Sequence, residues 1–249
     1  MDAAANVPDA AAHLPAVGLF VTGTGTGVGK TVLSAALLAA IAATGVRVRA
    51  HKPIVTGLDE AAAGGRAAAW PPDHELLGRV CGTAPEEVSP LRYGPAVSPH
   101  LAAALAGEPV DPAAVIDAAR DAAAAAARAQ AVLVVEGAGG LLVPLTDDLS
   151  VRDLAVELRL PLLIAARPSL GTINHTLLSV EAARAADLDV RAVVLTPWPR
   201  SPSAMELSNL ETIARLGRVE VATLAPARSP AIPELAGVGE ALPWRRWLG

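Results

Sequence analysis

Six short apolar runs alternate along the chain with longer segments of helix-forming composition. The runs cover residues 16–22, 46–51, 131–136, 161–166, 190–195 and 219–224, and we read them as strands. Strands that alternate with helices pair in parallel, because each crossover helix returns the chain to the same edge of the sheet. The pattern therefore predicts an α/β fold with a mostly parallel sheet of about six to seven strands flanked by helices.

Helices are expected between these runs, at 30–43, 73–81, 99–106, 112–129, 150–158, 173–186 and 204–216. The alanine tract 122–127 is low in complexity, but alanine is the best helix former, so we expect it to be folded. Residues 57–72 are bracketed by Gly and Pro and show no period, which predicts a mobile surface loop.

Length and charge limit the classes of protein to which the chain can belong. Its 249 residues suit a single domain, expected at 16–249 after a flexible leader at 1–15. Twenty basic and 25 acidic residues give a net charge of −5 without a basic cluster, which argues against a nucleic-acid partner. No apolar stretch is long enough for a membrane span, so we expect no membrane partner.

The single cysteine, Cys81, excludes an internal disulfide and a cysteine-rich metal site. We read it as a small packed apolar side chain. This cysteine usage is typical of the reducing cytoplasm, where we expect the protein to be located.

A glycine-rich turn follows the first apolar run. Gly25, Gly27 and Gly29 alternate directly before Lys30 and Thr31. A backbone that lacks side chains can direct its N–H groups at a phosphate chain, and the helix that follows adds partial positive charge. Lys30 could then reach the β- and γ-phosphates of a nucleotide, and the Thr31 hydroxyl could bind Mg²⁺.

The spacing of this turn differs by one residue from the usual phosphate loop, because Thr24 stands where that pattern has glycine. The dinucleotide pattern fails as well, since it needs glycine where Val28 or Lys30 stands. The Lys-Thr pair decides for a nucleoside triphosphate and for a fold of the P-loop NTPase type.

Two other runs end on charged residues, and the carboxyl ends of parallel strands meet at one edge of the sheet. Glu136 ends the run 131–136, where a buried carboxylate needs a cation: Mg²⁺, or a basic side chain in a structural ion pair. Lys52 follows the run 46–51 and is either a member of the same site or a solvated lysine at a strand end.

Together, residues 23–31, 52–57, 98–100, 136–145 and 170–178 resemble, in the same order, motifs of dethiobiotin synthase, the ring-closing enzyme of biotin synthesis. The resemblance extends from about residue 17 to 225. It implies that the enzyme joins CO₂ to 7,8-diaminopelargonic acid, with ATP or another nucleoside triphosphate and Mg²⁺, and yields dethiobiotin. It also implies a homodimer with substrate bound at the subunit interface.

The resemblance assigns roles to residues that match the family motifs. Lys52, beside the carbamate, and Lys30 are the catalytic residues; Thr31, Asp73 and Glu136 are metal ligands, with Asp59 as the alternative to Asp73. The nucleotide set is Gly27, Val28, Gly29, Lys30, Thr31, Val32, Asp73, Glu136, Gly137, Ala138, Gly139, Thr196, Pro197 and Pro226. The substrate set is Thr26, Thr56, Gly171, Thr172 and Asn174, of which the last three would otherwise be read as a helix cap.

Two departures from the family pattern bear on these roles. Gly25 stands where the family commonly has an acidic residue, and we infer no loss of phosphate binding. The asparagine that commonly reads adenine has no counterpart in 195–202, so the nucleotide base stays open, with contacts through backbone groups near Thr196, Pro197 and Pro226.

A positioning or partitioning ATPase is the alternative of another class. Residues 243–249 bring Trp244, Arg245, Arg246 and Trp247 together, as in a short membrane-surface anchor or in a C-terminal helix with tryptophan packed on the core. That class carries a signature lysine early in its phosphate loop, and no lysine precedes Lys30. Two further classes, an iron protein with cluster cysteines and a glutamine amidotransferase, fail for lack of thiols.

Overall fold

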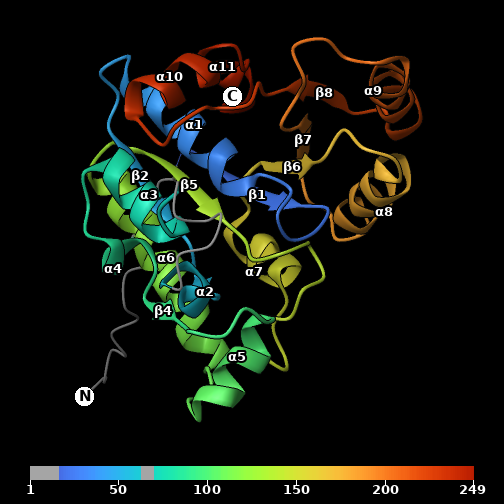
Figure 1. Ribbon diagram of the computed structural model, residues 1–249. Helices are drawn as coiled ribbons and strands as arrows, with labels where there is room; N and C mark the ends of the chain where they lie inside the picture. The colour runs from blue at the N-terminus through green and yellow to red at the C-terminus, as the bar shows by residue number, and fades with distance from the viewer. Residues whose placement is uncertain (1–16, 63–69) are drawn as a thin grey trace, which may run out of the picture.

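The computed structural model describes residues 17–62 and 70–249, so the expected leader at 1–15 lies outside the described residues. A six-stranded sheet forms the centre, with the strands arranged side by side in the order β2-β5-β1-β6-β7-β8 (Figure 1). Every neighbouring pair is parallel. The strands are β1 (Gly18–Gly23), β2 (Val48–His51), β5 (Val132–Glu136), β6 (Leu162–Ala166), β7 (Val190–Leu195) and β8 (Glu220–Thr223). All six expected strands are confirmed.

The seven expected helices are also confirmed, with small shifts at their ends. They are α1 (Lys30–Ala42), α3 (Asp73–Cys81), α5 (Pro99–Ala106), α6 (Pro112–Arg128), α7 (Val151–Leu158), α8 (Thr172–Arg184) and α9 (Ala204–Gly217). The sequence did not predict α2 (Leu58–Ala62), α4 (Pro85–Val88), α10 (Ile232–Glu240) or a small parallel pair, β3 (Ile54–Val55) with β4 (Leu91–Arg92). Helix α11 (Trp244–Trp247) is the C-terminal helix of the second reading of 243–249.

Helix α2 corrects the expectation of a loop over 57–72. Asp59 and Glu60 lie in its first turn, where carboxylates interact favourably with the exposed N–H groups and the helix dipole. Tyr93 and Gly94 accept hydrogen bonds from the backbone of Leu58 and Asp59, which ties the start of this helix to the chain after β4. Residues 63–69 of the expected loop lie outside the described residues.

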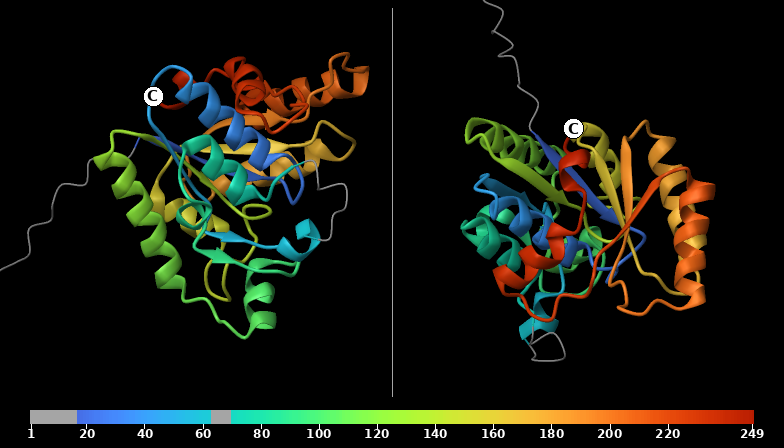
Figure 2. Two further views of the ribbon diagram at one scale, coloured as in Figure 1. Left: turned by 60° about the vertical axis from the view of Figure 1, so that its left-hand side comes forward. Right: turned by 90° about the horizontal axis from the view of Figure 1, so that it is seen from above.

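Helices cover both faces of the sheet, because side chains alternate between the faces along each strand. Leu19 and Val21 of β1 belong to a core cluster with α1, α3, α10 and α11, whereas Phe20 belongs to a second cluster with α5 to α9. Figure 2 shows these layers from the side and from above. The free Cys81 packs against the first cluster, and burial raises the pKa of its thiol to about 12, which confirms that it is a packed side chain.

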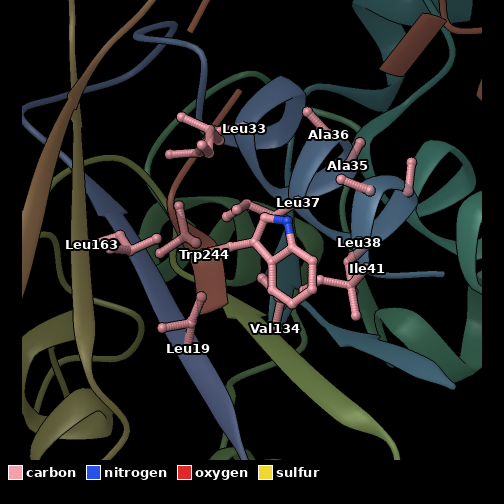
Figure 3. Close-up of a cluster of buried hydrophobic side chains, with 14 of the residues drawn as sticks. Leu19, Leu33, Ala35, Ala36, Leu37, Leu38, Ile41, Val134, Leu163 and Trp244 are labelled. Atoms are coloured by element: carbon pink, nitrogen blue, oxygen red, sulfur yellow. The ribbon is translucent and has the colours of Figure 1, made fainter. Parts of the chain in front are cut away.

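The C-terminal tail completes the first core cluster. The indole of Trp244 lies beside Leu37, Leu38 and Ile41 of α1, in the cluster that also contains Leu19 and Val134 (Figure 3). Trp247 is 1% exposed and donates a hydrogen bond from Nε1 to Glu220. The tail therefore packs on the core, as the second reading of 243–249 predicted, and its tryptophans are not available as a membrane anchor. None of the described helices combines the length and apolarity that a bilayer crossing requires.

Candidate active site at the carboxyl edge of the sheet

The glycine-rich turn connects β1 to α1 at the carboxyl edge of the central strands (Figure 1). Gly27 and Gly29 have positive φ angles of 70° and 95°, a region that favours glycine. A Cβ at Gly29 would lie 2.9 Å from the Thr196 methyl group. Helix α1 begins at Lys30 and has no side-chain cap, so its first N–H groups are free to bind an anion.

Lys30 folds back over this turn. Its ammonium group is buried and donates a hydrogen bond to the Gly25 carbonyl over 3.0 Å. Burial and the nearby charge of Lys52 lower the pKa of Lys30 to about 8, while Glu136 and Asp73 oppose this shift. The ammonium group thus has a carbonyl as its partner, which is a weaker counterpart than a phosphate oxygen.

Lys52 joins two carboxylates that come from different parts of the chain. Its Nζ lies 2.6 Å from Oε1 of Glu136 at the end of β5 and 3.1 Å from Oδ2 of Asp73 at the start of α3. Thr31 of α1 donates its hydroxyl to the same Glu136 oxygen over 2.8 Å. The structure thereby brings Lys52, Thr31, Asp73 and Glu136 together.

The charges of this cluster hold Lys52 and Asp73 ionised. Burial alone would lower the pKa of Lys52, but the charges of Glu136 and Asp73 and their hydrogen bonds outweigh it and raise that pKa above its usual range. Burial would raise the pKa of Asp73, but the charge of Lys52 and its hydrogen bond outweigh this effect and lower that pKa. Lys52 is therefore a permanent cation at neutral pH.

The cluster fits a divalent cation. Oε2 of Glu136 is fully buried without a hydrogen-bond partner, an orphan acceptor that a metal ion would satisfy. The Asp73 carboxylate is 44% exposed, so it also has room for a ligand. Within residues 17–62 and 70–249, no group of three or more His, Cys, Asp or Glu side chains is arranged to bind a metal ion, so this cluster offers only two carboxylates and the Thr31 hydroxyl. Two carboxylates and a hydroxyl are hard oxygen ligands, which suit Mg²⁺ because that ion keeps several waters.

Of the two candidate aspartates, only Asp73 lies at this cluster. Asp59 is an exposed residue of α2, its backbone N–H binds the Gly94 carbonyl, and its carboxylate lies against Gly94. This arrangement favours Asp73 as the third metal ligand.

The loop after β5 closes the other side of the phosphate turn. The N–H of Gly137 binds the Val21 carbonyl, and Gly140 forms a bridge with Thr24. Gly139 has a φ of 62°, and a Cβ on it would lie 3.6 Å from the Thr26 hydroxyl. Ala138 is half-buried between these glycines. The second glycine-rich stretch therefore lies directly beside the first.

The remaining predicted residues lie outside the cluster of Lys52, Thr31, Asp73 and Glu136. Thr196 is buried against Gly29, while Pro197 and Pro226 are exposed in the loops after β7 and β8. Val32 packs its side chain on the first core cluster, and Thr56 follows β3 as a half-buried residue. Gly171 is the N-cap of α8, which begins at Thr172 and presents Asn174 to solvent. No hydrogen bond among the described residues joins Thr56 or the start of α8 to Lys52.

Arg167 is a residue that the sequence reasoning missed. It directly follows β6, and its Nε and Nη2 atoms both donate to the Gly27 carbonyl, over 2.9 and 2.6 Å. Its position one residue beyond an apolar strand, at the edge where Lys52 and Glu136 also lie, is the only signal that the sequence offers.

A family model described as an AAA domain matches residues 17–234. The chain is 44% identical over 217 residues to the ATP-dependent dethiobiotin synthetase of Anaeromyxobacter sp. (strain Fw109-5), covering 86% of this chain and 92% of that protein. The chain is 39% identical to the protein of the same name from Haloferax mediterranei, covering 90% of this chain and 90% of that protein. It is 37% identical to the one from Brucella abortus (strain S19), covering 88% of this chain and 97% of that protein.

A solved structure supports the fold alone. The signal recognition particle receptor FtsY from Elizabethkingia anophelis in complex with GDP superposes with a TM-score of 0.50 at 15% identity, covering 90% of this chain and 63% of that chain. This likeness agrees with the P-loop NTPase type of architecture that the sequence predicted.

Proposed function

The chain belongs to the ATP-dependent dethiobiotin synthetase family, and from this premise we propose that it closes the ureido ring of dethiobiotin in biotin synthesis. Its substrates are 7,8-diaminopelargonic acid, CO₂ and ATP. The observation that carries the proposal is the placement of Lys52, between two carboxylates and beside the phosphate turn that holds Lys30.

The reaction proceeds in three steps. One amine captures CO₂ as a carbamate and loses a proton. The carbamate oxygen attacks the γ-phosphorus of ATP, the bond to the β,γ-bridging oxygen breaks, and a carbamic–phosphoric anhydride and ADP form. The second amine attacks the carbamoyl carbon, the ring closes, phosphate leaves and a second proton is released. Activation is needed because a carbamate oxygen is a poor leaving group.

The residues of the site contribute charge and position. Two unit charges of like sign 4 Å apart repel by about 4 kcal/mol at an effective dielectric near 20, so a carbamate and a triphosphate meet only among cations. Lys52 stays protonated and serves as a fixed cation for the carbamate, and Lys30 serves the β- and γ-phosphates. Such positioning and charge stabilisation are most of what a protein contributes to phosphoryl transfer.

Mg²⁺ is the proposed metal, with Thr31, Asp73 and Glu136 as its protein ligands. When bound, it supplies positive charge to the phosphate oxygens. Support for this assignment comes from the orphan Oε2 of Glu136 and from the exposure of Asp73.

For the rest of the nucleotide, we propose contacts along both glycine-rich turns and at the loops after β7 and β8. The triphosphate lies along Gly27, Val28, Gly29 and Val32 and the backbone of Gly137, Ala138 and Gly139. The base meets backbone groups near Thr196, Pro197 and Pro226.

We further propose a homodimer with the diamine bound at the interface, where Thr26 and Thr56 of one subunit and Gly171, Thr172 and Asn174 of the other contact it. The N-terminus of α8 has no side-chain cap and can accept the substrate carboxylate. A single domain over 16–249 and a cytoplasmic location complete the proposal.

A direct assay tests the activity. Purified protein, diaminopelargonate, ATP, Mg²⁺ and ¹³C-labelled bicarbonate should yield dethiobiotin that carries the label in its ureido carbon, detected by mass spectrometry, with one ADP per ring. Lys52→Ala should abolish this turnover. ATP hydrolysis that does not depend on the diamine, or equal turnover of Lys52→Ala and wild type, would contradict the proposal.

A further inference from the structure

We propose that Arg167 is a positioning residue of the phosphate turn, which holds the Gly27 carbonyl outward and thereby aims the Val28 N–H at the nucleotide phosphates. This inference rests on the proposed nucleotide binding. The two hydrogen bonds from Nε and Nη2 converge on one oxygen, so the guanidinium plane fixes the direction of that carbonyl as well as its position.

The main chain around Arg167 is itself held in place. β6, which ends one residue earlier, pairs with β1, and Ala165 is the register partner of Gly23 at the start of the turn. Pro168 follows directly and restricts the backbone of Arg167 to extended conformations. The side-chain amide of Asn209 in α9 donates to the carbonyls of Pro168 and Ser169, over 3.3 and 3.4 Å. The arginine therefore reaches the turn from a fixed base.

The effect on Val28 follows from the geometry of the peptide bond. The Gly27 carbonyl and the Val28 N–H belong to one planar trans unit, so they point in opposite directions. Holding the carbonyl toward Arg167 turns the N–H to the other side of the turn. Within the described residues this N–H has no hydrogen-bond partner, although Val28 is only 7% exposed and its side chain packs in the first core cluster. An unpaired donor in this turn is suited to a phosphate oxygen.

Arg167 also strengthens the donor that it aims. A cation that binds a carbonyl polarises the whole peptide unit, which increases the partial positive charge on its N–H. The side chain of Arg167 is exposed and forms no ion pair in the described part of the chain, so its charge is not cancelled by a carboxylate. The arginine thus acts on the phosphates through Val28 and does not need to touch the diamine.

The test compares Arg167→Gln and Arg167→Lys with Arg128→Gln as a matched control. Arg128 is an exposed arginine at the last residue of α6, at the edge of the sheet where β5 begins, so its loss removes the same charge far from the turn. ATP and ADP dissociation constants are measured by calorimetry with Mg²⁺, together with KM and kcat and the unfolding midpoint of each variant.

The proposal expects Arg167→Gln to weaken ATP and ADP binding about tenfold, the loss typical of one charge-assisted hydrogen bond. KM for ATP should rise, KM for diaminopelargonate and the unfolding midpoint should not change, and Arg167→Lys should recover part of the affinity. In ¹⁵N NMR spectra, the Val28 amide shift caused by ADP in wild type should be reduced in Arg167→Gln.

Three results would overturn the proposal: unchanged nucleotide affinity in Arg167→Gln, an equal loss in Arg128→Gln, or a full Val28 shift in Arg167→Gln. Calorimetry needs no turnover. If the wild type binds ATP but makes no dethiobiotin, the proposed function fails while the role of Arg167 is still decided by these affinities.

Discussion

Lys52→Met removes the charge at the centre of the site while keeping most of the apolar length of the side chain. The native side chain is 5% exposed, and its ammonium group lies 2.6 Å from Glu136 and 3.1 Å from Asp73. Glu136 is fully buried, and after the substitution it would keep only the hydroxyl of Thr31 as a hydrogen-bond donor. The variant therefore contains a buried carboxylate without a counter-ion.

The expected loss of stability follows from these distances. At 2.6 Å the attraction to Glu136 is about 6 kcal/mol with an effective dielectric near 20, before the cost of dehydrating both groups is subtracted. Asp73 adds less, because its carboxylate is 44% exposed and screened by water. Removing one partner of a buried pair costs about 3–5 kcal/mol in measured cases, and we expect the free energy of unfolding to fall by that amount.

Urea unfolding of metal-free protein at pH 7 measures this loss, and two comparisons assign its cause. Lys52→Met/Glu136→Gln should regain most of the stability, because the buried carboxylate that lost its counter-ion is then neutral. Mg²⁺ should stabilise Lys52→Met more than the wild type, because a cation that binds only the folded state no longer competes with Lys52 for the carboxylates.

A loss below about 1 kcal/mol would refute the reasoning, since it would place the pair in the range of exposed ion pairs. The same would follow from a double variant as unstable as Lys52→Met, or from equal stabilisation of both proteins by Mg²⁺. In either case something other than Lys52 would balance the charge of Glu136.

Three further predictions concern the turn, a buried histidine and the tail. Gly29→Ala should lower the free energy of unfolding by about 1–3 kcal/mol and weaken ATP binding, because φ is 95° and the new Cβ would meet a methyl group at 2.9 Å. Gly25→Ala is the control, because a Cβ there would have open space around it. Urea unfolding and calorimetry should show no change in its stability or its ATP affinity. His51 is 2% exposed, and burial lowers its pKa from 6.5 to about 4. As the pH falls, the unfolded chain therefore binds the proton before the folded chain does, and the free energy of unfolding should fall by about 3 kcal/mol between pH 6.5 and pH 4. His51→Asn should remove this part of the pH dependence of urea unfolding. Trp244→Ala should lower the free energy of unfolding by about 3–5 kcal/mol, because it removes a buried indole from the core. Arg245→Gln, at an exposed residue of the same helical turn, should lower it by less than about 1 kcal/mol. Equal losses in the two variants would mean that the indole is not part of the core.

The sheet was predictable because each of its central strands is a continuous apolar run, which strands buried on both faces require. Ile54–Val55 and Leu91–Arg92 were not, because two residues cannot display a period. Helix α10 was missed for a different reason. Gly237 and Gly239 lower its helix propensity, yet a Cβ at Gly239 would overlap the Ala36 carbonyl of α1. Gly239 therefore lowers the helix propensity of the sequence and at the same time allows α10 to pack closely on α1.

The site divides in the same way. Lys30 and Thr31 could be predicted as site residues because a local pattern places them at a helix start, and Glu136 because a carboxylate on an apolar strand needs a cation. The choice between Asp73 and Asp59 depends on how the chain returns after β2, which no local pattern encodes. Arg167 acts on a backbone carbonyl 140 positions earlier in the chain, so nothing near it in the sequence reveals the contact.

The chain contains only two lysines, Lys30 and Lys52, and both lie at this site, although it has 20 basic residues in all. The positive charges of Lys30 and Lys52 together equal the negative charges of Asp73 and Glu136, so these four side chains are neutral as a whole. Four side chains without net charge have no excess positive charge for a triphosphate. A divalent ion bound to the two carboxylates would change this balance by two charges and would free Lys52 from its ion pairs. We therefore expect nucleotide affinity to depend on the metal, through the ion pair that stabilises the protein without it.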